Sequence, residues 1–191
     1  MQLSFATGNK GKYVEASRIA SEYGVKLRQV YRQKIEIQSD DLKEIARFAA
    51  KEASEAIRRS VVSEDSGFFV HSLGGFPGPY SSYVYRTLGY DGILRLMKHV
   101  RNRNAHFQAA VAFCRPRTRP VCFSGIVEGV ISRRPKGRQG FGFDPIFVPN
   151  DGDGRTFAQM NAKEKNFISH RGKAFFAFFD WVSGRHEWTL T

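Results

Sequence analysis

A short apolar segment that turns at once into glycine, asparagine and lysine most constrains how this chain can fold. Residues 3–6 (L-S-F-A) have the composition of a buried strand, and residues 7–12 (T-G-N-K-G-K) supply turn and helix N-cap residue types. A strand that enters a helix through such a turn presents free backbone N–H groups and the positive end of a helix dipole. The segment therefore predicts an anion site, above all for phosphate. An ordinary βα turn with solvated lysines would give the same pattern.

The next residues predict that the chain opens with a β-α-β unit. Residues 13–23 have the apolar spacing of a helix, with Val14, Ala16, Ile19, Ala20 and Tyr23 on its buried side. Gly24 fits the position after a helix C-terminus. Residues 25–31 alternate apolar and polar side chains, which predicts a strand with one exposed face. The connection is long enough for parallel pairing, so an α/β fold class is expected.

Two adjacent acids interrupt the next apolar segment. Residues 61–63 predict a short buried strand, which reaches Glu64, Asp65, Ser66 and Gly67 and resumes at residues 68–70. Carboxylates are costly to bury unless they are paired or bound to a cation. A surface bulge with solvated acids is the other interpretation, but apolar residues flank the acids on both sides and favour a functional role.

The remaining elements are predicted from periodicity and turn signals. A helix at 42–59 is capped by Ser39 or Asp40, and a last helix starts within 163–173 and continues through the apolar residues 174–181. Cys114 and Cys122 flank a hairpin turn symmetrically, and we interpret them as packing residues that are neighbours across the strands. No linker divides the chain, so residues 1–191 are expected to form a single domain. The other predicted elements are helices at 82–88 and 89–100 and strands at 105–115, 121–132 and 146–148.

Composition favours a cytoplasmic protein with anionic partners. Lys and Arg number 30 against 18 acids, a formal net charge of +12, which suits nucleic acid, a membrane surface or phosphorylated metabolites without choosing among them. A basic patch at residues 133–138 raises the alternative of a nucleic-acid-binding protein, although a solvated loop explains it as well. No segment has the roughly 18 consecutive apolar residues of a membrane span, and no secretory signal is expected. Two cysteines do not indicate a disulfide framework.

The chemistry of several residues also suits a metal ion and a purine base. The carboxylates of Glu36, Glu64 and Asp65 are hard oxygen ligands that suit Mg²⁺ together with substrate phosphates. The rings of Phe141 and Phe143 offer a stacking face for a base, and Asp144 can accept a hydrogen bond from a ring N–H. His170 and Arg171 supply donors. Because arginine only donates, it favours a 6-keto oxygen over a 6-amino group.

Five motifs in order, spread over nearly the whole chain, resemble the inosine triphosphate pyrophosphatase family, also known as XTP/dITP diphosphatases. The motifs are T-G-N-K-G-K at 7–12, E-D-S-G at 64–67, G-F-P-G-P-Y-S at 75–81, F-G-F-D-P at 141–145, and E-K-N at 164–166 with S-H-R-G-K at 169–173. The resemblance implies a Mg²⁺-dependent hydrolase that cuts ITP, dITP or XTP between the α and β phosphates. It also implies a long mixed α/β sheet bent into two lobes with the nucleotide between them, and a homodimer.

The resemblance also assigns roles to residues. Asp65, Glu64 and Lys12 would be catalytic, with Asp65 both a metal ligand and the base for the attacking water, and Glu36 would be the second metal ligand. The family often has proline before this glutamate, whereas Ile35 stands here, and Asp40 and Asp41 are close in sequence. A related reading keeps the enzyme class with another nucleotide, as in Maf-type pyrophosphatases. The implied substrate-binding residues are Thr7, Gly8, Asn9, Lys10, Gly11, Lys12, Ser66, Phe141, Gly142, Phe143, Asp144, Lys165, His170 and Arg171.

Overall fold

A mixed seven-stranded sheet forms the centre of the protein. The computed structural model describes residues 1–31 and 37–184. The strand order is β2-β1-β3-β5-β6-β7, with β4 paired to β3 beside this path. β1 is parallel to β2 and β3, and all other pairs are antiparallel, so the predicted mixed α/β sheet is confirmed. The strands are β1 (Gln2–Ala6), β2 (Lys26–Val30), β3 (Val61–Val70), β4 (Pro77–Gly78), β5 (Asn104–Cys114), β6 (Val121–Ile131) and β7 (Phe147–Pro149).

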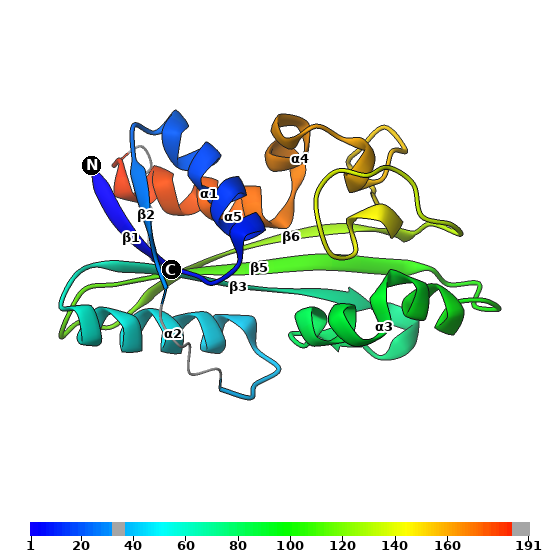
Figure 1. Cartoon of the computed structure of the whole chain (residues 1–191), viewed down its shortest axis with the longest axis horizontal. Helices are drawn as coiled ribbons and strands as arrows, with labels where there is room; N and C mark the ends of the chain where they lie inside the picture. The colour runs from blue at the N-terminus through cyan, green and yellow to red at the C-terminus, as the bar shows by residue number, and fades with distance from the viewer. Residues whose placement is uncertain (32–36, 185–191) are drawn as a thin grey trace.

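Helices cover both faces of the long strands β3, β5 and β6 (Figure 1). α1, α4 and α5 lie on one face, and α2 and α3 lie on the other. No helix in the described parts of the chain is long and apolar enough to cross a membrane. The helices are α1 (Lys10–Glu22), α2 (Leu42–Ile57), α3 (Ser81–Leu96), α4 (Ala162–Ile168) and α5 (His170–Val182), with short 3₁₀ turns η1 (His71–Leu73), η2 (Asp144–Ile146) and η3 (Phe157–Gln159).

The β-α-β opening forms as predicted, but α1 begins earlier. Asn9 caps the helix, with its side-chain oxygen accepting from the N–H of Lys12, so the helix starts at Lys10 and not near residue 13. Gly24 follows the helix with φ +66°, a left-handed conformation that glycine adopts without strain. One assignment on the helix was wrong. Val14 is 45% exposed, and its neighbour Glu15 points inward with 7% exposure.

Two further boundaries differ from the prediction. Asp41, and not Ser39 or Asp40, caps α2, because its carboxylate accepts from the N–H of Lys43. β3 is one continuous strand across the acids, because β5 pairs with it residue by residue from Val61 to Val70. A partner strand along the whole length supplies the backbone hydrogen bonds that a bulge would break.

The predicted last helix is two helices that share Ser169. This residue has ψ 157°, so it ends α4, and its hydroxyl then accepts from the N–H of Gly172 to begin α5. The break brings the two helices so close that a Cβ on Gly172 would stand 1.7 Å from the carbonyl oxygen of Asn166. Only glycine fits there. In α3, Gly89 with φ +64° and ψ −175° separates the two helical segments that the sequence predicted.

The hairpin of β5 and β6 forms as predicted, but its register does not pair the cysteines. Cys122 lies opposite Ala112 and not opposite Cys114. Cys114 is buried in a cluster with residues of α2, and both thiols are free. The interpretation of both cysteines as packing residues agrees with this placement, because Cys122 packs against the cluster that contains Cys114, although the two are not direct cross-strand partners.

Candidate active site

One edge of β3 is open over the residues that carry the acids. On this edge β1 pairs with β3 only as far as Ser63, and β4 pairs only from Phe68 onward. Glu64 to Gly67 are therefore paired with β5 on one side and, within the described residues, with no strand on the other. The parallel strands β1 and β2 both end beside this edge, at Ala6 and Val30, and in α/β sheets ligands bind beyond the carboxyl ends of such strands.

The start of α1 lies over this open edge. Thr7 is buried, and its hydroxyl accepts from the N–H of Asn9 at 3.2 Å. Gly8, Asn9 and Lys10 are exposed. Asn9 satisfies one N–H of the first turn, and the others in that turn have no partner inside the helix. The predicted anion site is therefore a helix N-terminus that faces solvent.

Lys12 connects this helix to the two acids of β3. Its ammonium lies 2.9 Å from the carboxylate of Glu64 and 3.8 Å from that of Asp65. Successive residues of a strand point to opposite faces, so Glu64 and Asp65 lie on different sides of β3 and Lys12 reaches both across the open edge. The side chain of Glu64 is fully buried, whereas that of Asp65 is 15% exposed. Asp65 is thus the acid of this pair that a ligand can approach.

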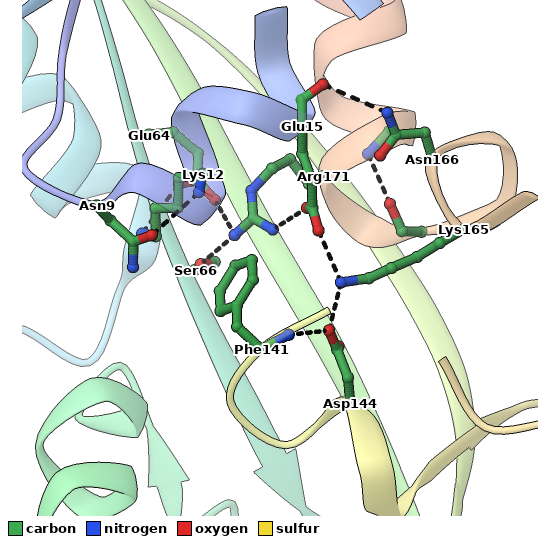
Figure 2. Close-up of polar contacts among 12 residues, drawn as sticks. Asn9, Lys12, Glu15, Glu64, Ser66, Phe141, Asp144, Lys165, Asn166 and Arg171 are labelled. Carbon is green, nitrogen blue, oxygen red and sulfur yellow. Dashed lines mark hydrogen bonds and ion pairs between the residues drawn. The ribbon is translucent and has the colours of Figure 1, made fainter. Parts of the chain in front are cut away.

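Glu15, which the sequence reasoning missed, is the centre of a buried ion network (Figure 2). One carboxylate oxygen accepts from Lys165 at 2.8 Å, and the other accepts from Arg171 at 2.6 Å. Arg171 also donates to Glu64 and to the hydroxyl of Ser66, both at 3.1 Å. Burial alone would raise the pKa of Glu15, but the adjacent Arg171 and Lys165 outweigh this and lower it. Glu15 therefore holds both cations in place as an anion.

A second missed residue, Asn166, ties α4 to the same helix. Its side-chain amide donates to the carbonyl oxygen of Glu15 at 3.3 Å. The sequence held one signal for Glu15: it is an acid beside Ala16, three residues after Lys12 and four before Ile19, which places it at the border of the apolar stripe. No comparable signal marks Asn166.

The loop before η2 is held against this network by Asp144. The same carboxylate oxygen accepts from the N–H of Phe141 at 2.8 Å and from Lys165 at 2.5 Å. Burial raises the pKa of Asp144, although Lys165 opposes the shift. These contacts favour a role for Asp144 in positioning the loop and Lys165.

Phe141 is the ring of this loop that faces the site. The ring lies 5.0 Å from the ammonium of Lys165 and 5.4 Å from the guanidinium carbon of Arg171. It also packs so closely on α1 that a Cβ at Gly11 would stand 2.7 Å from it. Gly142 continues the loop with φ +64°. The ring and the two cations therefore form one wall of the site (Figure 2).

Phe143 does not share this wall. Its ring is 2% exposed and stacks on Phe68 at 5.0 Å in the core. We therefore reassign Phe143 from base stacking to packing. His170 is also buried, stacked on Phe107 at 4.7 Å. Burial and the neighbouring Arg171, Lys165 and Lys12 hold the pKa of His170 well below its usual value, so the imidazole is neutral.

The charges of the site are largely balanced within the protein. Lys12 is paired with Glu64, Lys165 with Glu15 and Asp144, and Arg171 with Glu15 and Glu64. The positive charge of these cations is therefore already offset by acids. A ligand with several negative charges would compete with these acids for the same cations. Glu36, the predicted second metal ligand, lies outside the described residues.

The comparisons with known proteins decide the family. Residues 3–181 match the Ham1 family. This chain belongs to the Ham1 family. It is 47% identical over 189 residues to a dITP/XTP pyrophosphatase of Methanopyrus kandleri, a match that covers 97% of this chain and 100% of the relative. It is 45% identical over 182 residues to a dITP/XTP pyrophosphatase of Thermococcus kodakarensis, covering 95% and 97% of the two chains.

Solved structures agree with the fold of this Ham1 family chain. The Ham1 protein of Staphylococcus aureus superposes with a TM-score of 0.82 at 26% identity, covering 97% of this chain and 100% of that one. A nucleoside-triphosphatase, or dITP/XTP pyrophosphatase, of Mycobacterium abscessus superposes with a TM-score of 0.71 at 32% identity, covering 93% and 98%. The resemblance predicted from the five motifs is thus confirmed.

The buried pair of Glu64 and Arg171 predicts a loss of stability in acid. Burial disfavours the charged Glu64, but Arg171 and Lys12 outweigh this and lower its pKa from 4.5 to about 2. A carboxyl group whose pKa is lowered by folding stabilises the folded state at pH values above its unfolded-state pKa. This contribution is lost as the pH falls from 4.5 through 2. The contribution is on the order of 3 kcal/mol.

We therefore expect the free energy of unfolding to fall between pH 4.5 and 2 more steeply than in a Glu64→Gln variant. Urea titrations across this range measure the difference, with Glu22→Gln on the exposed end of α1 as the control. Equal slopes in the wild type and Glu64→Gln would contradict the assignment.

Proposed function

We propose that this chain hydrolyses dITP, XTP and ITP between the α and β phosphates and releases the nucleoside monophosphate and pyrophosphate. Its relatives named dITP/XTP pyrophosphatases match it over nearly their full length. The observation that carries the proposal is the meeting of the α1 N-terminus, Lys12 and Asp65 at the open edge of β3. In this account the enzyme removes deaminated purine nucleotides from the cytoplasmic pool.

The triphosphate would lie over the start of α1. Backbone N–H groups of residues 8–11 would bind its oxygens, with the helix dipole favouring the negative charge. The amide of Asn9 and the ammonium groups of Lys10 and Lys12 would add hydrogen bonds. Lys12 already lies at the carboxylates of Glu64 and Asp65, which supports its position between the phosphates and the catalytic acid.

Magnesium fits the donor set at this position. Asp65 presents a partly exposed carboxylate, and the cations around it are already shared with acids, so a triphosphate needs further positive charge. Asp65 would hold the ion, with Glu36 as the second ligand. Leu42 at the start of α2 belongs to the same buried cluster as Ala110, the cross-strand partner of Asp65, so α2 begins on the same face of the sheet. When bound, Mg²⁺ supplies charge neutralisation and lowers the pKa of a water ligand.

Asp65 would accept the proton of the attacking water. The water oxygen forms the new bond to phosphorus, the bridge between the α and β phosphates breaks, and pyrophosphate leaves. Glu64 would not take this proton, because it is fully buried, accepts from Arg171 and forms an ion pair with Lys12. Its part is to hold these two cations beside the substrate.

The base would stack on Phe141, with Lys165, His170 and Arg171 at its edge. Within the described residues, Arg171 Nε and His170 Nδ1 are buried without a hydrogen-bond partner. An unsatisfied buried donor is costly, and a keto oxygen at purine position 6 would satisfy the Nε–H. A 6-amino group would bring a second donor to the same place, so adenine would be rejected.

The active molecule is expected to be a homodimer. Phe76, Tyr80 and Tyr83 are exposed between 40% and 62% around β4 and the start of α3, and they form the candidate surface. Sedimentation velocity would test the state, and a monomer at micromolar concentration would contradict it.

A nucleotide panel tests the proposed function. With Mg²⁺ present, pyrophosphate release from ITP, dITP and XTP should exceed that from ATP, GTP and dTTP by at least tenfold in kcat/KM. Preference for dTTP would indicate a pyrophosphatase for another nucleotide. Absence of turnover together with salt-dependent DNA affinity would favour the nucleic-acid-binding alternative.

A further inference from the structure

A second group of metal-ligand side chains lies farther along the sheet from the nucleotide site. Phe69 on β3, His106 on β5 and Glu128 on β6 are direct cross-strand partners in one row. Partners in such a row project from the same face of the sheet. The ring of His106 stacks on that of Phe69 with centroids 4.7 Å apart and planes 5° apart, which fixes the orientation of the imidazole.

His71, the first residue of η1, completes this group. Its Nε2 atom lies 3.0 Å from Nδ1 of His106 and 3.8 Å from a carboxylate oxygen of Glu128. One potential ligand atom from each of the three residues lies within 4.8 Å of the others. The group therefore draws on a 3₁₀ turn and two strands that are distant in sequence.

These separations fit the first coordination sphere of a transition metal. Zinc binds nitrogen and oxygen at about 2.0–2.2 Å in a tetrahedral arrangement, which places neighbouring ligand atoms roughly 3.3 Å apart. The two separations from His71 fall on either side of this value. His71 and Glu128 are exposed, so their side chains have room to rotate toward a shared ion.

We propose that His71, His106 and Glu128 form a binding site for one divalent transition-metal ion, with Zn²⁺ as the best match. Imidazole nitrogen suits zinc, whereas Mg²⁺ prefers oxygen ligands and would remain with the acids of the nucleotide site. The side chains of His71 and Glu128 are 40% and 55% exposed, so the ion can enter from solvent and keep a water as its fourth ligand.

The site is separate from the catalytic acids. Asp65 pairs with Ala110, whereas His106 pairs with Phe69, four residues farther along β3. At about 3.3 Å per strand residue this is roughly 13 Å. An ion held here would connect the η1 turn to β5 and β6 without touching the nucleotide. Because it would bind the folded chain, it would also stabilise the fold by mass action.

Zinc binding to the full chain, freed of any affinity tag, tests the proposal. We would titrate Zn²⁺ against a chromophoric chelator in a large excess of Mg²⁺, so that the catalytic acids are occupied. The variants are His71→Ala and Glu128→Gln, which alter exposed side chains, and Asp65→Asn at the nucleotide site. His99→Ala is the matched control, because His99 is an exposed histidine outside the group.

The wild type, His99→Ala and Asp65→Asn should each bind one equivalent of zinc with the same affinity. His71→Ala should bind it at least tenfold more weakly, and Glu128→Gln more weakly than the wild type. Added zinc should also raise the melting temperature of the wild type but not that of His71→Ala. Failure of the wild type to bind zinc in magnesium, or a loss of less than tenfold in His71→Ala, would overturn the proposal, whatever the nucleotide specificity proves to be.

Discussion

Replacing Asp65 by asparagine is expected to lower kcat for dITP by a factor on the order of 10²–10⁴, the usual contribution of a general base. The amide has nearly the shape of the carboxylate, but it cannot accept the proton of the attacking water and is a weak ligand for Mg²⁺. Because the Asp65 side chain is partly exposed and lies 3.8 Å from Lys12, the fold should remain intact. Steady-state kinetics with pyrophosphate detection measure the loss.

Asp91→Asn is the matched control for this substitution, because Asp91 is an exposed aspartate on α3. It should retain the wild-type rate. Circular dichroism and the melting temperature should be unchanged in both variants. Turnover of Asp65→Asn within a few fold of the wild type would remove Asp65 from the mechanism, whereas loss of the folded state would show that its role is structural.

Glu15→Ala should be the most destabilising single change in the site, by about 3–5 kcal/mol in the free energy of unfolding. Glu15 lies between Lys165 and Arg171, which are 3% and 2% exposed. Removing the acid leaves two buried cations with less compensating charge. Removing one partner of a buried ion pair typically costs about 3–5 kcal/mol in the free energy of unfolding. Urea denaturation measures the effect.

Two variants show whether charge or packing is responsible. Glu15→Gln keeps the volume and removes the charge, so it should be destabilised nearly as much as the alanine variant. Glu22→Ala removes an exposed glutamate from the end of the same helix and should change stability by less than about 0.5 kcal/mol. A stable Glu15→Gln protein would mean that the ion network does not hold the site together.

Local patterns predicted most of the fold because they act within a few residues. The apolar stripe of α2, the glycine after α1 and the alternating residues of β2 each fix an element by themselves. The continuity of β3 could not be predicted in this way. It depends on β5, whose pairing over Val61 to Val70 overrides the polar residues in the middle of the strand.

The site was predicted unevenly for the same reason. The proposed phosphate turn is a local feature, so the sequence alone indicated its candidate residues, and the family resemblance supplied the other candidates. Glu15 was missed because its importance comes from Lys165, which is 150 positions away in sequence. Phe143 was misassigned because the sequence does not distinguish between two aromatic residues of one loop. The difference comes from tertiary packing, in which Phe143 stacks on Phe68 in the core.

The identity of the products formed from dITP in magnesium buffer shows where the triphosphate lies relative to Asp65. If the triphosphate lies over the start of α1 with Asp65 at the bridge between its α and β phosphates, the products are dIMP and one equivalent of pyrophosphate. Separation of nucleotides by anion exchange, with parallel assays for pyrophosphate and orthophosphate, measures both. Formation of dIDP with orthophosphate, or no turnover of dITP, would contradict the account.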